Sequence, residues 1–122
     1  MINDINSELI NVYMQVRDNV ENVIELLLNM QIAFWKMDND KRKEYFYSKR
    51  DRFNELIKQS VSTKEKAALF IFLNKTCFNG LYRVNNKGFY NVPMGSYKKT
   101  LICDTDNLYL ISKLLKNVEF VI

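Results

Sequence analysis

Histidine is absent from this 122-residue chain, and only two cysteines are present. Without histidine, a Ser-His-Asp triad, a Cys-His nucleophile and a mixed Cys/His zinc site cannot form. Cys77 and Cys103 stand far apart and show no CxxC spacing. We therefore expect both cysteines to be reduced residues that pack inside the protein.

Glycine and proline are also scarce, and both are confined to one region. The three glycines and the single proline all fall between Gly80 and Gly95, so the backbone freedom of the chain is concentrated there. The same region lacks acidic residues, because no Asp or Glu occurs between Lys66 and Cys103. Six positive charges fall in this acid-free segment: Lys66, Lys75, Arg83, Lys87, Lys98 and Lys99. Since the whole chain carries +4, the other residues sum to −2.

Long apolar runs are missing as well. No run approaches the roughly 20 residues that span a bilayer, and the first residues lack the basic and apolar regions of a signal peptide. The hydrophobic content of 48% and the length of 122 residues are typical of one globular domain. We expect a cytoplasmic protein with no membrane association.

Apolar residues recur at helical spacing over most of the chain, which predicts a mainly α protein. We expect a small helical bundle of about five helices, at residues 7–18, 20–37, 41–58, 63–75 and from 104 or 105 to about 115. Ser62 and Glu65 have the spacing of a capping box at the start of the fourth helix. Asp104 or Thr105 can cap the last one.

A protruding β-hairpin is predicted at about residues 81–93. Residues 82–84 and 89–92 favour strands, residues 85–88 tolerate the positive φ of a tight turn, and Pro93 ends the second strand. A basic hairpin without acidic residues can enter a nucleic-acid groove. An ordinary surface hairpin with solvated lysines is the alternative.

The order of residues in this region resembles a known family. Residues 74–85, NKTCFNGLYRVN, followed by Lys87-Gly88 and residues 91–98, NVPMGSYK, resemble the target-recognition segment of Dam-type (D12 class) DNA adenine methyltransferases of the DpnII or MboI kind. Residues 3–10, NDINSELI, match a second family motif, and Tyr47, Arg50, Phe53 and Asn54 give a weaker match. The resemblance covers this whole chain but only the middle of the family's enzyme.

The resemblance implies three parts. Residues 1–5 would be a remnant strand of the cofactor domain, 6–116 the helical target-recognition domain, and 117–122 a remnant strand of the catalytic domain. In the family, the residue that matches Asp4 holds the ribose of S-adenosylmethionine, so the resemblance gives Asp4 a cofactor role in the full enzyme only. A helix cap or first-turn charge is the alternative for Asp4.

The resemblance also implies roles in reading DNA bases at a GATC-like site. Arg83 matches the arginine that reads a guanine edge, for which its fork of donors is suited. Leu81 and Pro93 match positions that meet a thymine methyl group. Asn79 and Phe78 match residues that fill the space beside the extruded adenine. As structural alternatives, Asn79 could shape the turn before Gly80, and Phe78 could lie in the core.

Further DNA contacts are implied around the same segment. Tyr97 matches an aromatic residue at the edge of the site, and Asn85, Asn91, Lys98 and Lys99 would lie near phosphates. This sequence departs from the family at two positions, where Ser96 replaces the usual arginine and Met94 the usual phenylalanine. Because phosphate contacts supply most of the affinity for DNA, we expect weak and salt-sensitive binding to double-stranded DNA.

The family's catalytic motifs are not in this sequence. No glycine precedes Gly80, so the glycine-rich cofactor loop is missing, and one proline cannot supply an Asp-Pro-Pro-Tyr motif. We expect the chain alone to bind no cofactor or metal and to be inactive. Three functions remain open: a target-recognition fragment of an adenine methyltransferase, a stand-alone DNA-binding or competitor module, and a helical protein-interaction domain. The missing methyltransferase segments, or a second copy of the chain, are the other expected partners.

Overall fold

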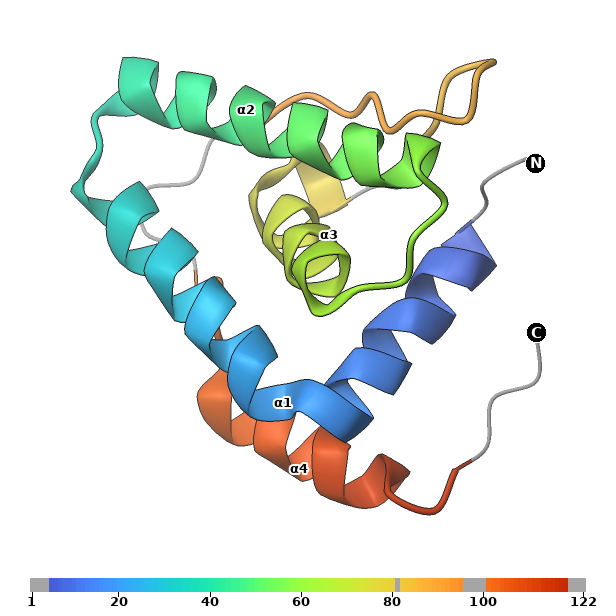
Figure 1. Ribbon diagram of the computed structural model, residues 1–122. Helices are drawn as coiled ribbons and strands as arrows, with labels where there is room; N and C mark the ends of the chain where they lie inside the picture. Colours follow the sequence, from blue (N-terminus) through green and yellow to red (C-terminus); the bar gives the residue numbers. More distant parts are fainter. Residues whose placement is uncertain (1–4, 81, 96–100, 119–122) are drawn as a thin grey trace.

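The computed structural model describes residues 5–80, 82–95 and 101–118 as a mainly helical fold (Figure 1). Figure 1 shows the two arms of a bent α1 and the whole of α2 around three sides of α3, with α4 below the bend of α1. The described elements are α1 (Ile5–Lys36), α2 (Asn39–Lys58), α3 (Lys64–Thr76), the short 3₁₀ turn η1 (Phe78–Gly80) and α4 (Thr105–Leu115).

The prediction of five helices is wrong, because the first two expected helices form one bent helix. Asn19 alone leaves helical geometry, with φ −133° and ψ 37°. The Asn19 side chain donates to Oε1 of Gln15 at 2.8 Å, and both Val16 and Val23 stay buried on either side of the bend. A single non-helical residue therefore bends α1 where the sequence predicted a break.

Helix α3 forms the centre of the core. Ala67, Ala68 and Phe72 are fully buried, and buried residues occupy all sides of the helix. The middle of the helix, residues 66–73, therefore has no polar face for solvent, while Lys64, Asn74 and Lys75 near its ends are exposed, which fits its contacts with both α1 and α2. Phe72 meets Phe34 of α1 and Tyr45 of α2 with ring centroids 5.6 and 5.7 Å apart, so aromatic contacts join the three helices.

Side-chain caps fix three helix starts. Asp38 accepts from the amide of Lys41 at 2.9 Å, and Asp104 caps α4, as one of the two predicted residues. At α3 the cap is Thr63, whose Oγ1 accepts from the Lys66 amide at 3.2 Å, and not Ser62. The predicted capping box is wrong because the Glu65 carboxylate instead binds the guanidinium of Arg52 at 2.8 Å.

The predicted protruding β-hairpin is wrong too. The described residues contain no strand, and residues 82–95, here called the 82–95 loop, show only the isolated antiparallel bridges Val84–Tyr90 and Cys77–Met94. The loop runs beside α2 in Figure 1, and both Tyr90 and Val92 are buried in the core. Side chains of α2 bind three backbone groups of this loop, so part of its backbone hydrogen bonding comes from a helix and not from a strand ladder.

The expected terminal strands fall mostly outside the described residues, at 1–4 and 119–122, while Ile5 already belongs to α1. Over the described ranges no helix combines the length and the apolar character needed to cross a membrane. Those ranges also hold no cluster of three or more Cys, Asp or Glu side chains that could bind a metal ion.

Candidate nucleic-acid interface

The inner side of the 82–95 loop is held by aromatic packing. Tyr82 stacks on Phe70 of α3 with centroids 5.5 Å apart, and the edge of Tyr90 meets Phe53 of α2 at 5.9 Å. Tyr82 and Tyr90 also contact each other at 5.5 Å. Burial, followed by a hydrogen bond with Cys77, raises the pKa of the Tyr90 hydroxyl, so Tyr90 stays neutral and serves as an anchor.

The tip of the loop is shaped by one side chain. Oδ1 of Asn85 accepts from the amides of Lys87 at 2.9 Å and Phe89 at 3.1 Å, and the Gly88 amide donates to the Asn85 carbonyl. Gly88 has a φ of +83°, which favours glycine. The Asn85 side chain therefore forms the turn at the tip of the loop, and the phosphate contact that the family resemblance implies for it stays a prediction.

The outer side of the loop presents Arg83. This residue is exposed, and its Nε donates to Oδ1 of Asn91 at 3.0 Å across the loop. The backbone joins the same two residues, because the Asn91 amide donates to the Arg83 carbonyl at 3.1 Å. Asn91 thus fixes the Nε end of the guanidinium of this exposed residue.

Two side chains of α2 bind the backbone of the loop, although neither was predicted as a site residue. Asn54 bonds both backbone groups of Tyr90, at 2.7 and 2.9 Å, and Nη1 of Arg50 donates to the carbonyl of Val92 at 3.3 Å. The Arg50 guanidinium lies over the ring of Tyr47, 4.6 Å from its centroid. The weaker family match at positions 47–54 was a sequence signal for these residues.

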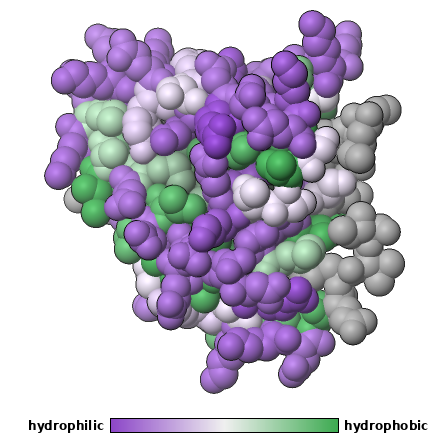
Figure 2. All heavy atoms as spheres, viewed as in Figure 1, coloured by the Kyte–Doolittle hydropathy of each residue, from purple (hydrophilic) through white to green (hydrophobic). Residues whose placement is uncertain are grey.

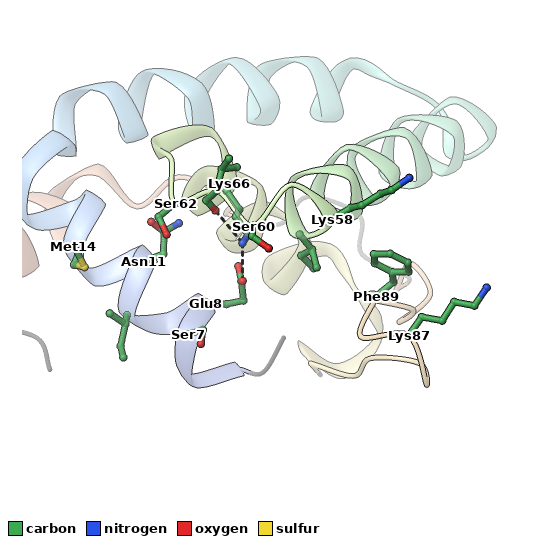
Figure 3. A pocket seen from close by; sticks show the side chains of 13 residues that line it. Ser7, Glu8, Asn11, Met14, Lys58, Ser60, Ser62, Lys66, Lys87 and Phe89 are labelled. Carbon is green, nitrogen blue, oxygen red and sulfur yellow. Dashed lines mark hydrogen bonds and ion pairs between the residues drawn. The ribbon is translucent and has the colours of Figure 1, made fainter. Parts of the chain in front are cut away.

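Not all of the predicted basic segment contributes accessible charge. Lys66 is buried, its Nζ lies 2.8 Å from Oε1 of Glu8, and it also donates to the Val61 carbonyl at 3.1 Å. Figure 3 shows this pair at the wall of a pocket of about 460 Å³, with the side chains of Lys58 and Lys87 extending outward. Glu8 therefore neutralises one of the six predicted positive charges.

The surface near α2 and the loop is mainly polar. Figure 2, in the same view as Figure 1, shows mostly hydrophilic residues along the top of the molecule, where α2 lies, with hydrophobic residues in separate patches. Lys75, Arg83 and Lys87 are exposed members of the acid-free segment. Exposed positive charges attract polyanions, although the neighbouring helix α2 also exposes Glu44, Asp51 and Glu55.

The structure brings part of the predicted site together. Phe78, on η1, is 51% exposed and so does not lie in the core, and its amide donates to the carbonyl of the exposed Pro93 at 2.9 Å. Asn79 lies in the same turn, just before Gly80 with its φ of +62°. The remaining predicted residues lie outside the described ranges: Asp4, Leu81, Tyr97, Lys98 and Lys99.

Comparison with known proteins places the chain in a family. A family model described as "D12 class N6 adenine-specific DNA methyltransferase" matches residues 1–122. The chain therefore belongs to the D12 class of N6 adenine-specific DNA methyltransferases.

Individual relatives agree with this assignment. The chain is 49% identical over 98% of its length to Type II methyltransferase M.MjaIII of Methanocaldococcus jannaschii, of which it covers 41%. It is 42% identical to Type II methyltransferase M1.LlaDCHI of Lactococcus lactis subsp. cremoris, with 96% of this chain and 39% of the relative covered. The chain is 36% identical to a DNA adenine methylase of Haemophilus influenzae, with 90% of this chain and 36% of the relative covered. The chain thus spans about two fifths of the length of these relatives.

Proposed function

We propose that this chain is the target-recognition portion of a site-specific DNA adenine methyltransferase and that it binds a GATC-like duplex through η1 and the 82–95 loop. Membership of the D12 class supports DNA as the substrate. Within the chain, the observation that carries the proposal is the placement of Arg83, which is exposed on the outer side of the loop and fixed by Asn91 at 3.0 Å.

In this proposal Arg83 reads a guanine through two acceptors on its major-groove edge, since its bond to Asn91 uses Nε and not Nη1 or Nη2. Pro93 and Leu81 meet thymine methyl groups, while Phe78 and Asn79 fill the space beside the extruded adenine. The exposure of Phe78 and Pro93 supports their parts in this arrangement.

Residues around this centre bind the DNA backbone and the edge of the site. Asn85, Asn91, Lys98 and Lys99 lie near phosphates, and Tyr97 contacts the edge of the site. Phosphate contacts position the protein without reading sequence, so these residues set affinity more than preference.

Methyl transfer belongs to a longer polypeptide in this proposal. The family resemblance assigns the cofactor S-adenosylmethionine to a glycine-rich loop that this sequence lacks, and Asp4 alone gives too few contacts for a nucleotide-sized ligand. We therefore place the chain in a cytoplasmic modification system, in which other segments hold the cofactor and the extruded adenine. The names of two relatives as Type II methyltransferases support a link to restriction and modification.

Gel-shift titration of the purified chain tests the proposal directly. We expect binding to a GATC duplex that is tighter than binding to a scrambled duplex at low salt, with both complexes weakening as salt rises. Equal binding to both duplexes would contradict the site preference. A parallel assay with labelled S-adenosylmethionine should show no methyl transfer by the chain alone. Any transfer above background would contradict the proposal that methyl transfer needs a longer polypeptide.

Protein interaction through α4 is a second candidate function. Leu110 and Leu114, one turn apart on α4, are 54% and 70% exposed, and neighbouring exposed apolar side chains can mark a protein contact. The proposed partner is the rest of the methyltransferase polypeptide, because this chain spans about two fifths of its relatives. Co-expression with that polypeptide should give a complex that Leu110→Lys with Leu114→Lys weakens. An unaffected complex would remove α4 from the contact.

A further inference from the structure

One residue of α2 makes an unusual double contact with the 82–95 loop. Oδ1 of Asn54 accepts from the Tyr90 amide at 2.7 Å, and Nδ2 of Asn54 donates to the Tyr90 carbonyl at 2.9 Å. Both polar backbone groups of Tyr90 are therefore bound by the two ends of one side-chain amide. Since Tyr90 is 3% exposed, these bonds replace hydration that the burial of the residue removes.

The hydrogen bonds of the neighbouring residues explain why Tyr90 depends on Asn54. Across the Val84–Tyr90 bridge, the Asn85 amide donates to the Phe89 carbonyl, and the Asn91 amide donates to the Arg83 carbonyl. The bridge thus uses backbone groups of residues 89 and 91. Tyr90 lies between them with its own amide and carbonyl turned toward α2, where Asn54 binds them.

This contact is one residue away from the group that holds Arg83. Asn91 follows Tyr90 directly, and its Oδ1 accepts from Nε of Arg83 at 3.0 Å. Any shift of the Tyr90 backbone moves Asn91 and with it the guanidinium. A base contact requires its donors to be placed within about 0.5 Å and about 10–20° of the productive geometry. Because Asn54 of α2 holds the Tyr90 backbone, it also sets the position of the Arg83 guanidinium.

We infer that Asn54 is a positioning residue, which fixes Arg83 through Tyr90 and Asn91 and so sets the sequence preference of the proposed DNA interface. The inference rests on the proposed function and adds a determinant that does not touch DNA.

Other contacts hold the rest of the loop without Asn54. A substitution of Asn54 can therefore be distinguished from a general effect on folding. The Tyr90 ring contacts Phe53 and Tyr82, and Arg50 binds the Val92 carbonyl. Removal of the Asn54 amide therefore leaves the loop attached but frees the backbone of Tyr90. Asn54→Ala should reduce the preference for the correct site, while binding to scrambled DNA changes little.

A double-mutant cycle tests this coupling. Wild type, Asn54→Ala, Arg83→Ala and the double variant are compared for binding to a GATC duplex and to a duplex in which the guanine pair is exchanged. We expect Asn54→Ala to lower the preference at least about fivefold, the lower end of one bidentate base contact. In the Arg83→Ala background the same change should have no further effect on preference, because it acts through Arg83.

Amide exchange provides a readout without DNA. In Asn54→Ala the Tyr90 amide should exchange faster by at least about tenfold, while amides of α3 keep their protection. Asn39→Ala, at an exposed position on the same helix, is the matched control and should change neither exchange nor preference. If Asn54→Ala does not fold, Asn54→Asp keeps the acceptor for the Tyr90 amide and loses the donor, with Asn39→Asp as its charge-matched control.

The outcomes separate the two proposals. A wild-type chain with no preference for GATC would contradict the proposed function itself. A wild-type preference that a folded Asn54→Ala retains, or equal losses from Asn54→Ala with and without Arg83, would overturn only the positioning role.

Discussion

The four helices α1–α4, here called the helical frame, and the 82–95 loop are stabilised in different ways. Rings and aliphatic side chains hold α1, α2 and α3 together around a fully buried Phe72. The loop contributes Tyr90 and Val92 to the same core but is shaped by polar side chains that bind its backbone, chiefly Asn54 and Asn85. We therefore expect that changes in the frame alter the free energy of unfolding, whereas changes in the loop alter sequence preference.

The largest effect should come from the centre of the frame. Phe72→Ala leaves a cavity between Phe34 and Tyr45 and should lower the free energy of unfolding by about 3–5 kcal/mol. Denaturant unfolding measures this loss. The control Ile32→Ala, at a position 50% exposed on α1, should stay within about 0.5 kcal/mol of wild type. A loss below about 1 kcal/mol for Phe72→Ala would contradict the central place of α3.

The buried ion pair comes next. Lys66→Met removes the cation that lies 2.8 Å from the buried Glu8 carboxylate, which should cost about 3 kcal/mol of unfolding free energy. Adding Glu8→Gln removes the buried negative charge and should recover part of this loss. Lys64→Met, exposed two residues earlier, is the matched control. If both lysine variants unfold at the same denaturant concentration, the pair does not stabilise the frame.

The phosphate contact proposed for Lys98 gives the next prediction. If Lys98 binds a phosphate, Lys98→Ala should weaken binding to all duplexes alike and reduce the slope of log K against log salt by about 1. Lys113→Ala, exposed on α4, should leave that slope unchanged. Titrations at several salt concentrations measure both. A selective loss for GATC duplexes would instead make Lys98 a base reader.

The smallest effect concerns a surface pair of the frame. The hydrogen bond from Arg52 lowers the pKa of the Glu65 carboxyl below its ordinary value of 4.5. The lowered pKa contributes stability above about pH 4.5, which is lost as the pH falls through the folded-state pKa. Arg52→Gln should therefore have a slightly lower free energy of unfolding than wild type at pH 7 and the same free energy of unfolding near pH 2, as measured by denaturant unfolding. The control Lys43→Gln should have the free energy of unfolding of wild type at both pH values.

Local pattern was sufficient for most of the frame. Helical spacing predicted the positions of α2, α3 and α4, and Asp104 was one of two predicted caps. The bend at Asn19 was placed correctly but interpreted as a break, since spacing alone does not show whether a helix continues past one irregular residue. The capping box failed because Arg52, distant in sequence, competes for Glu65.

The site depended more on distant contacts. Turn chemistry at residues 85–88 was visible in the sequence, and Asn85 and Gly88 form that turn. The residues on either side form only the isolated bridge Val84–Tyr90, and the backbone groups of Tyr90 that face away from this bridge are bound by Asn54, 36 residues earlier in the sequence. The neutralisation of Lys66 by Glu8 is equally a pairing between distant residues that no local pattern indicates.

Arg83→Ala tests the central claim, that the outer side of the loop reads DNA through one guanidinium. Wild type and variant are titrated with a GATC duplex and a scrambled duplex at the same salt, and Lys87→Ala serves as a basic control on the same loop. We expect Arg83→Ala to lose about 1–3 kcal/mol of discrimination and to keep its scrambled-duplex affinity within a few fold. An unchanged preference in a folded Arg83→Ala would contradict the claim.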